Sequence, residues 1–410
     1  MRIAVISPFL DRRHGTERCL IEQLERFPVA AGDEIHIYSQ RVEDLHGVIR
    51  YKSGAPATTG QYLFWHRVPF IPGPHLVQYI FWFYANMVCR RWDAYKNGLK
   101  YALVYSPGIN ASDADAVAVH AIFSEFYPRL FARLRLRSSP ASNWLRLLHR
   151  RLYYRLIIAL EKKFYRQPGF SLAGVSALVS AQLARHFQRP DARVIHHGVD
   201  TQFFSVSRRL EQRPLVRQRF GLAPDAFVVL LIGNDFRNKG LDALLRALAE
   251  LPDFDWKLLV VGDDVSSDHK NFVRDQAIAD RIFFRPSSPD VLQFYAAADA
   301  YVGPSLEDAF GMPVLEAMAC GLPIICSGRA GVSELVSHGS DGIILSDPQD
   351  AAEITSALRS LMSDPALCQR LGDRASATAR EHSWDRNADA AWQWLREVAR
   401  KKSGLRGDHG

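Results

Sequence analysis

Short apolar segments alternate with amphipathic segments from the first residues of the chain. Residues 3–7 form an apolar run typical of a buried parallel strand, residues 16–27 have helical spacing, and a second strand pattern follows at 35–38. Strands that alternate with helices pair in parallel, so this pattern predicts a parallel sheet covered by helices. The same region contains further predicted strands at 103–106, 116–120 and 172–175, and a helix at 176–187.

The alternation restarts after a polar connection that we expect at residues 205–224. The chain has 410 residues, about twice the usual length of one domain. We therefore expect an α/β protein with two doubly wound domains, residues 1–198 and residues 199–383, and a helix at 384–402 that returns to the first domain. The second domain contains predicted strands at 227–233, 256–262, 281–284, 300–303 and 323–327, helices at 241–251, 273–280, 291–298 and 313–320, and a helical tail from 350.

The composition and the cysteines restrict the class of protein. Hydrophobic residues make up 48% of the chain and charged residues 23%, which excludes a disordered or low-complexity chain. Five cysteines form no CxxC pair, which favours a reducing compartment. The first residues lack the pattern of a signal peptide, and the longest apolar run, 76–89, is too short to span a bilayer. We expect a cytoplasmic protein without a membrane-spanning segment.

The net charge of +7 is concentrated in one segment. Arg129 to Arg166 contains eleven Lys or Arg residues and one acidic residue, so the rest of the chain carries a net −3. Leucines interleave with these arginines, as in a basic amphipathic helix on an anionic membrane, and a second stretch, Gln61 to Tyr95, mixes aromatic with basic residues. A solvated basic face is the alternative. Nucleic-acid binding is disfavoured because no recognition module accompanies the charge.

The most informative motif follows the predicted strand at 300–303. Phe310, Gly311 and Met312 precede Pro313, which we expect at the first helical position. Free N–H groups at a helix start bind anions, so this turn is suited to a diphosphate. Glu316 in the first turn could accept hydrogen bonds from a ribose diol, and Asp308 could do so from another hydroxylated group. The alternative is that both carboxylates only stabilise the helix terminus.

This segment resembles the signature of the retaining glycosyltransferase family four, in which two acidic residues flank seven others before an Ala-Met-Ala-x-Gly-x-Pro helix. The resemblance implies a GT-B fold, with two facing Rossmann-like domains, an interdomain cleft that holds the site, and a crossing C-terminal helix. It also implies metal-independent hexose transfer from a nucleotide sugar, without a cofactor. The family usually has Glu where this chain has Asp308, and Glu307 either compensates or is exposed.

Three further positions match the family in the first domain and the nucleotide loop, and Arg237 is a weaker candidate because relatives place the arginine elsewhere in that loop. Gly15 matches the loop that approaches the donor diphosphate, although His14 replaces the preceding glycine. His120 matches a histidine that faces the reacting sugar. Lys239 matches the lysine that binds donor phosphates, and Arg237 is a second phosphate-binding candidate. The resemblance thus assigns catalytic roles to His120, Lys239, Asp308 and Glu316.

Other matches concern the nucleobase and the connection between the domains. Arg285 and Pro286 match the segment that lines the base, and Gly262 borders the same pocket. Residues 194–204 match the interdomain turn, with His197 at the usual Asn position. The donor-binding set implied by the resemblance is Gly15, Arg237, Lys239, Gly262, Arg285, Pro286, Asp308, Phe310, Gly311, Met312 and Glu316.

The stretch 232–240 is similar to bacterial lipopolysaccharide-core glucosyltransferases, which favours UDP-glucose over GDP-mannose as donor. The implied acceptor is a lipid-linked or cell-surface glycan, such as lipopolysaccharide or exopolysaccharide, reached from the inner face of the membrane. The sequence has no dinucleotide fingerprint, phosphate-binding NTPase loop or zinc spacing, and Asp113-Ala-Asp115 is interpreted as a loop. A non-catalytic binder of nucleotide sugars or glycans and a sugar-nucleotide epimerase remain the alternatives.

Overall fold

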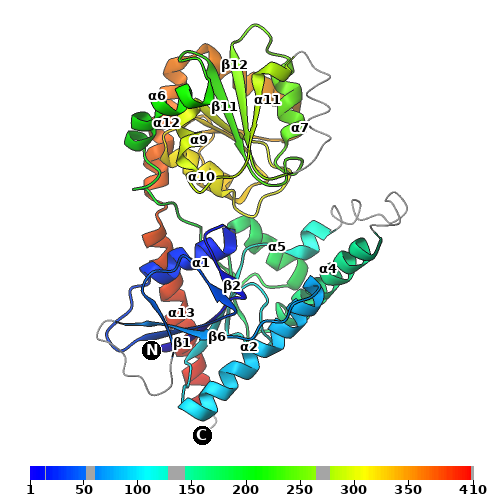
Figure 1. Cartoon of the computed structure of the whole chain (residues 1–410), viewed down its shortest axis with the longest axis vertical. Coiled ribbons are helices and arrows are strands. Elements are labelled where there is room, and N and C mark those ends of the chain that lie inside the picture. The colour runs from blue at the N-terminus through cyan, green and yellow to red at the C-terminus, as the bar shows by residue number, and fades with distance from the viewer. Residues whose placement is uncertain (14, 52–60, 128–143, 265–277, 408–410) are drawn as a thin grey trace. The chain divides into compact units, whose positions relative to one another are not determined.

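A computed structural model describes residues 1–13, 15–51, 61–127, 144–264 and 278–407. The chain forms two compact units. Unit 1 comprises Met1–His196 and Asn387–Gly410, and unit 2 comprises His197–Arg386. Figure 1 shows that each unit is a sheet with helices on both faces, as the α/β alternation predicts.

Unit 1 contains an eight-stranded sheet in which every pair of neighbouring strands is parallel. The sequence pattern missed three of these strands, β5 and β6 at one edge and β10 at the other. A short parallel pair, β2 (Phe9–Leu10) and β4 (Arg41–Val42), lies outside this sheet. In spatial order the eight strands are β10 (Arg193–Val194), β9 (Ser171–Gly174), β8 (Ala116–Val119), β7 (Leu103–Pro107), β1 (Arg2–Ile6), β3 (Glu34–Ser39), β6 (Leu63–Arg67) and β5 (Val48–Arg50).

Alternate residues of β1 face the two helical layers of unit 1. Ile3 and Val5 belong to a buried cluster with side chains of α1 (Gly15–Arg26) and α13 (Trp384–Gly407). Ala4 and Ile6 belong to a second cluster with Trp82 of α2. The described residues of this unit also form the helices α2 (His75–Asn97), α4 (Trp144–Phe164) and α5 (Ala177–Phe187).

The two aspartates of the Asp113-Ala-Asp115 sequence have structural partners. Arg90 on α2 donates two hydrogen bonds to the carboxylate of Asp113, at 2.7 and 3.2 Å. Asp115 accepts from the backbone N–H of Val104 at 2.7 Å and from Lys402 Nζ at 2.6 Å. These contacts tie the loop before β8 to α2, β7 and α13.

Unit 2 contains a six-stranded parallel sheet in the order β13-β12-β11-β14-β15-β16. Most residues of its central strands are buried, so these strands appear in the sequence as nearly continuous apolar runs. The strands are β11 (Phe227–Ile232), β12 (Trp256–Val261), β13 (Ile282–Arg285), β14 (Ala300–Gly303), β15 (Ile324–Ser327) and β16 (Ile343–Leu345). Among the described residues, the helices of this unit are α6 (Val206–Phe220), α7 (Leu241–Ala249), α9 (Leu292–Ala297), α10 (Met312–Ala319), α11 (Ala351–Ser363) and α12 (Pro365–Arg380), with 3-10 turns at Ala279–Arg281 and Gly331–Leu335.

The predicted polar connection at 205–224 is wrong, because most of it forms helix α6. Ser205 caps the helix start and Gly221 ends it in the left-handed conformation. Arginines take the inward positions that apolar residues usually fill: Arg213 and Arg217 bond the carboxylate of Asp299 at 2.5 and 3.0 Å. The predicted helix at 273–280 lies mostly outside the described residues.

Gly240 is required where the loop after β11 meets the end of β14. Its φ is +80°, and a Cβ built there would lie 2.0 Å from the carbonyl oxygen of Pro304. Gly221 has a similar φ of +69° with nothing within 4 Å of the same position. We predict that Gly221→Ala costs about 1 kcal/mol of backbone strain and that Gly240→Ala costs about 3 kcal/mol or more. Chemical denaturation of the two variants measures the difference, and equal losses would contradict it.

Candidate functional site

Lys239 lies in the loop between β11 and α7, at the carboxyl end of the unit 2 sheet. Its aliphatic chain lies on Gly233, where a Cβ would be 2.6 Å from Lys239 Cε. The ammonium group forms an ion pair with Asp308, with Nζ and Oδ2 2.5 Å apart. Both side chains are less than one-fifth exposed. The structure therefore brings together a predicted phosphate-binding cation and a predicted sugar-binding carboxylate from loops 69 residues apart.

Backbone contacts fix these two loops to each other. The N–H of Leu306 donates to the carbonyl oxygen of Asn238 at 2.7 Å, and Asn238 Nδ2 donates to the carbonyl oxygen of Glu307 at 2.8 Å. Glu307 is 6% exposed, so the alternative of an exposed Glu307 is wrong. Because both hydrogen bonds join the loops at Asn238, next to Lys239, the backbone that carries the ammonium group is held in place before any ligand binds.

Helix α10 begins at the turn that the sequence assigns to a diphosphate. Gly311 is the N-cap with φ +100°, Met312 is the first helical residue, and Pro313 is therefore the second rather than the first. The N–H of Phe310 donates to Asp308 Oδ1 at 3.3 Å, so the expectation that this N–H is free is wrong. The helix dipole still favours an anion at this turn.

Glu316 lies within α10 and is 4% exposed. Its Oε2 accepts a hydrogen bond from the hydroxyl of Tyr295 on α9 at 2.7 Å. Burial, and next the charge of Glu316, raise the pKa of Tyr295 well above its ordinary value, so the hydroxyl remains a donor. Sequence reasoning missed Tyr295, because an aromatic residue on a short apolar helix reads as ordinary core.

We predict that Tyr295→Phe weakens the use of a nucleotide-sugar donor without unfolding the protein. The ring still fills its place, but the carboxylate of Glu316 loses a hydrogen bond worth about 1.5–3 kcal/mol. The expected result is a rise of about tenfold in KM for the donor with a small change in kcat, measured by steady-state kinetics. An unchanged KM would show that Tyr295 does not position Glu316.

The residues assigned to the nucleobase lie at the carboxyl ends of β12 and β13. The N–H of Gly262 donates to the carbonyl oxygen of Arg285 at 3.0 Å. The Arg285 guanidinium lies over the rings of Phe220 and Phe283, 5.6 and 5.8 Å from their centroids, and Pro286 is exposed. Arg285 is thus held against α6 by its aromatic neighbours.

Hydrogen bonds continue along this edge of the sheet. Asn234 Oδ1 accepts from the N–H of Asp263 at 3.0 Å, and Asp263 Oδ1 accepts from the N–H of Ser287 at 3.0 Å. The hydrogen bonds from Ser287 lower the pKa of Asp263. Arg237 is exposed in the neighbouring loop. The ends of β11, β12 and β13 are therefore linked side by side, with Lys239 following the first of them.

Two predicted site residues lie in unit 1. Gly15 is the first residue of α1, and a Cβ built there would have nothing within 4 Å, so space alone does not require a glycine. His120 follows directly after β8. Burial lowers the pKa of its imidazole to about 4, so His120 is neutral at physiological pH and can donate and accept hydrogen bonds.

One face of α2 is apolar and exposed. Residues three or four positions apart share a helical face, and the residues on the opposite face, including Trp82 and Asn86, are buried. Contiguous exposed apolar surface marks an interaction site. This face, which we call the α2 stripe, consists of Val77, Ile80, Tyr84, Val88, Trp92 and Tyr95, which are 42% to 86% exposed.

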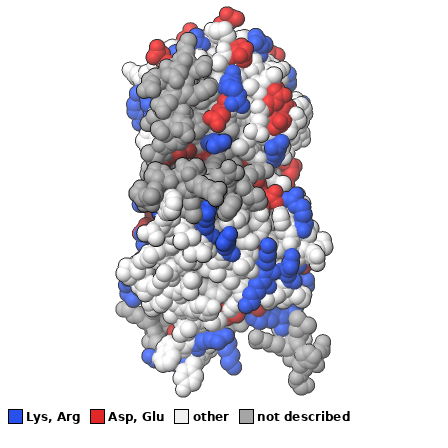
Figure 2. All heavy atoms as spheres, turned by 90° about the vertical axis from the view of Figure 1, so that its right-hand side faces the viewer, with Lys and Arg blue, Asp and Glu red and all other residues white. Residues whose placement is uncertain are grey.

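Helix α4 packs beside α2 and carries basic side chains. Leu76 N–H donates to His149 Nε2 at 3.3 Å, and the rings of Tyr79 and Tyr153 are 5.8 Å apart. Glu161 is buried and accepts from the N–H of Phe123 at 2.7 Å, so the one acidic residue of the basic segment faces inward. Figure 2 shows an uncharged surface of unit 1 bordered by Lys and Arg. Exposed residues of α4 include Trp144, Leu145, Leu148, Leu152, Arg146, Arg150 and Arg155.

The basic segment begins at Arg129, and its residues up to 143 lie outside the described residues. No helix among the described residues combines the length and the apolar character needed to cross a membrane.

Comparison with known proteins agrees with the fold. Residues 212–378 match the family model described as "Glycosyl transferases group 1". This part of the chain is therefore similar to that family, and the whole chain has the GT-B type of fold, with two parallel α/β units.

Individual relatives cover part of the chain. A D-inositol 3-phosphate glycosyltransferase from Streptomyces bingchenggensis is 34% identical over 246 residues, which is 56% of this chain and 53% of the relative. A second, from Paenarthrobacter aurescens, is 31% identical over 212 residues, 49% of this chain and 50% of the relative. The chain thus matches about half the length of these curated relatives.

Solved structures resemble the chain over nearly its whole length. WaaG, a glycosyltransferase involved in lipopolysaccharide biosynthesis, has a TM-score of 0.71 at 19% identity and covers 95% of this chain and 98% of its own. HepE from Anabaena, solved with UDP and glucose, has a TM-score of 0.68 at 20% identity and covers 97% and 99%. At such identities the likeness establishes the fold.

Proposed function

We propose that the protein is a retaining glycosyltransferase that moves a hexose from a nucleotide sugar to a glycan acceptor. The observation that carries this proposal is the ion pair of Lys239 and Asp308 beside the start of α10, with Glu316 one turn into that helix. The anion-binding turn suits a diphosphate, and the fixed cation suits the negative charge that develops on that diphosphate. The buried carboxylate suits a ribose diol.

Lys239 has the donors to serve two partners at once. A lysine ammonium group carries three N–H donors, of which Asp308 uses one. The others are available for the donor phosphates, so phosphate binding does not require the ion pair to break. When the bond between the sugar and the diphosphate breaks, Lys239 stabilises the negative charge on the leaving oxygens. Arg237 in the same loop is a second cation for this role.

The other predicted residues position the rest of the donor. Glu316 accepts hydrogen bonds from the ribose diol, Asp308 contacts the sugar, and neutral His120 faces the reacting sugar from unit 1. Gly262, Arg285 and Pro286 line the base, and Gly15 leaves room for the diphosphate. Asp308 is one methylene shorter than the usual glutamate and therefore reaches less far toward the sugar. Its ion pair with Lys239 takes the place of part of that contact.

We propose that the donor is UDP-glucose, and GDP-mannose is the second candidate. Support comes from the similarity of residues 232–240 to lipopolysaccharide-core glucosyltransferases and from the fold shared with HepE, whose structure holds UDP and glucose. The names of WaaG and of the inositol-phosphate enzymes support a glycan or phosphorylated acceptor.

We further propose that unit 1 attaches peripherally to an anionic membrane, where a lipid-linked or cell-surface glycan is elongated. The exposed α2 stripe beside the basic α4 supports this attachment, because apolar side chains insert at the headgroup level and cations attract anionic lipid. This arrangement places the excess positive charge of the chain on the acceptor side.

Incubation of the purified protein with a panel of nucleotide sugars, with and without membrane extract, tests the reaction. We expect UDP release from UDP-glucose only when the extract supplies an acceptor, measured by ion-exchange chromatography. Conversion of the donor without extract would indicate an epimerase. Donor binding without consumption would indicate a non-catalytic binder, and either outcome overturns the proposal.

Sedimentation with vesicles tests the membrane attachment separately. We expect binding to phosphatidylcholine vesicles that contain phosphatidylglycerol, weakened by salt, and little binding to phosphatidylcholine alone. Tyr84→Asp in the α2 stripe should reduce binding, whereas Leu215→Asp, which changes a similarly exposed apolar residue of unit 2, should not. Equal binding of both variants would contradict the role of the stripe.

A further inference from the structure

A cavity of about 460 Å³ opens between the carboxyl-terminal half of α2 and the ends of β5 and β6. It contains none of the residues assigned to the donor. Its wall on the strand side includes Arg50, Tyr51, His66 and Arg67, and its wall on α2 includes Val88, Trp92, Asp93 and Lys96.

The floor of this cavity is a fixed polar network. The ring of His66 stacks between Tyr38 and Tyr51, with centroids 4.5 and 4.3 Å away. Its Nδ1 is 2.8 Å from Asp93 Oδ2, and its Nε2 is 2.8 Å from Nδ1 of His36. These contacts hold the imidazole from two faces and both nitrogens, so the floor is formed before a ligand enters.

Asp93 is already occupied by its neighbours. Burial alone would raise its pKa, but hydrogen bonds from His66 and Tyr38 hold the pKa of Asp93 below its ordinary value. Tyr38 donates to Oδ2 at 2.7 Å, and Asn97 Nδ2 donates to Oδ1 at 3.2 Å. The one carboxylate of the lining is therefore charged and turned toward donors of the protein.

Three cations of the lining have no such partner. Arg50, Arg67 and Lys96 are exposed, and none of them forms an ion pair within the described residues. These three cations and the carboxylate of Asp93 together give the lining a net charge of +2. Unpaired cations at a concave site favour an anionic ligand, and arginine side chains suit phosphate oxygens in particular.

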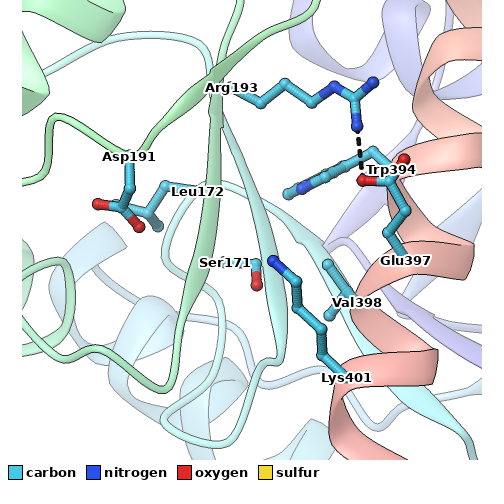
Figure 3. Close-up of a pocket in the computed structure, with 8 residues that line it drawn as sticks. All are labelled: Ser171, Leu172, Asp191, Arg193, Trp394, Glu397, Val398 and Lys401. Carbon is cyan, nitrogen blue, oxygen red and sulfur yellow. Dashed lines mark hydrogen bonds and ion pairs between the residues drawn. The ribbon is translucent and has the colours of Figure 1, made fainter.

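A second cavity of unit 1 provides a contrast. It has a volume of about 350 Å³ and lies where α13 packs on β9 and β10 (Figure 3). Its Arg193 pairs with Glu397 at 2.8 Å, and Asp191 accepts from Arg189. Three of its four charged side chains are thus engaged in ion pairs, and Lys401 is the exception, whereas the α2 cavity has three cations without an ion pair among the described residues.

The α2 cavity is continuous with the α2 stripe. Val88 and Trp92 belong to both, because they line the cavity and are 60% and 58% exposed. A phosphate held by the cations would therefore have apolar side chains at its side. This combination suits a phosphate that carries acyl chains better than a fully water-soluble one.

We propose that the α2 cavity binds the phosphate headgroup of an anionic membrane lipid, with Arg67 and Lys96 as its main cations and Trp92 beside the start of the acyl chains. This inference rests on the proposed attachment of unit 1 to the membrane and adds to it a defined lipid-binding site. Attachment thereby gains one fixed contact besides the general attraction of basic residues.

Titration with dihexanoyl phosphatidic acid below its critical micelle concentration tests the site without a membrane surface. We expect the wild-type protein to bind one equivalent by calorimetry. The double variant Arg67→Ala/Lys96→Ala should bind at least tenfold more weakly. The control Arg91→Ala/Lys100→Ala removes two exposed cations outside the cavity and should bind within twofold of wild type.

Three outcomes would overturn the site. If the two double variants bound the short-chain lipid equally, the cavity would have no role in binding. If the wild-type protein did not bind this lipid, the proposed site would be wrong. Inorganic phosphate or glucose 1-phosphate binding as tightly as the lipid would show a soluble ligand instead. Circular dichroism confirms that the variants, which change exposed side chains, are folded.

Vesicle sedimentation separates this inference from the attachment on which it rests. If wild type fails to sediment with anionic vesicles, the membrane attachment is wrong. If it sediments but Arg67→Ala/Lys96→Ala binds the short-chain lipid like the control, the attachment stands and the headgroup site is wrong.

Discussion

Replacing Lys239 with Met lowers kcat/KM for sugar transfer by about 10²–10³-fold, because the leaving diphosphate loses the cation that is fixed beside it. Methionine retains an apolar chain that can lie on Gly233, so the loop keeps its packing. Steady-state release of nucleotide in the presence of acceptor measures the effect. Most of the loss should appear in kcat, since the negative charge develops as the bond breaks.

The matched control for this variant is Lys257→Met. Lys257 lies on β12 in the same unit, partly exposed, with its ammonium 3.9 Å from Asp255. We expect activity within twofold of wild type. If Lys239→Met retained more than a third of the activity while Lys257→Met behaved as wild type, Lys239 would have no part in stabilising the leaving group.

Glu316→Gln is the second substitution with a large expected effect. The amide keeps the size of the side chain and an oxygen that can accept from Tyr295, but it removes the charge that we propose binds the ribose diol. A hydrogen bond to a charged group contributes about 1.5–3 kcal/mol, and two such bonds to the diol give a loss of about 10²–10⁴-fold in kcat/KM. Donor affinity, measured by calorimetry, should fall with it.

Glu250→Gln is the control for this substitution, because Glu250 is an exposed carboxylate at the end of α7. Combination with Tyr295→Phe adds a further check. If Tyr295 acts through the carboxylate of Glu316, the double variant should be no worse than Glu316→Gln alone. Donor affinity unchanged in Glu316→Gln would contradict the ribose role.

The sheets could be predicted from the sequence because their strands are buried on both faces. The strands of unit 2 read as continuous apolar runs, and β11 and β12 differ from their predicted ranges only by the glycine that follows each. The start of α5 could also be predicted, because Ser176 caps this helix.

Helix α6 and the edge strands could not be predicted in this way. The helix buries Arg217, whose partners are the carboxylate of Asp299 and several carbonyl oxygens, so its inward face shows no apolar period. Strand β6 buries His66 together with the apolar Leu63 and Phe64, and the partners of His66 come from β3 and α2. A pattern based on apolar spacing does not detect faces that are buried through polar contacts.

The residue types of the candidate site could be proposed from motifs, but their partners could not. Lys239 and Asp308 meet because two loops join at Gly240 and Pro304, and Tyr295 reaches Glu316 from another helix. These contacts depend on the strand order of the sheet. The spacing of residues in the sequence does not reveal the order of the strands in the sheet.

Transfer of labelled sugar tests the central claim most directly. The wild-type protein, incubated with UDP-[¹⁴C]glucose and membrane extract, should move label into the lipid-linked or polymer fraction in proportion to the UDP released, and Lys239→Met should do neither. Release of UDP without label in that fraction, or equal transfer by Lys239→Met, would contradict a glycosyltransferase whose leaving group is stabilised by Lys239.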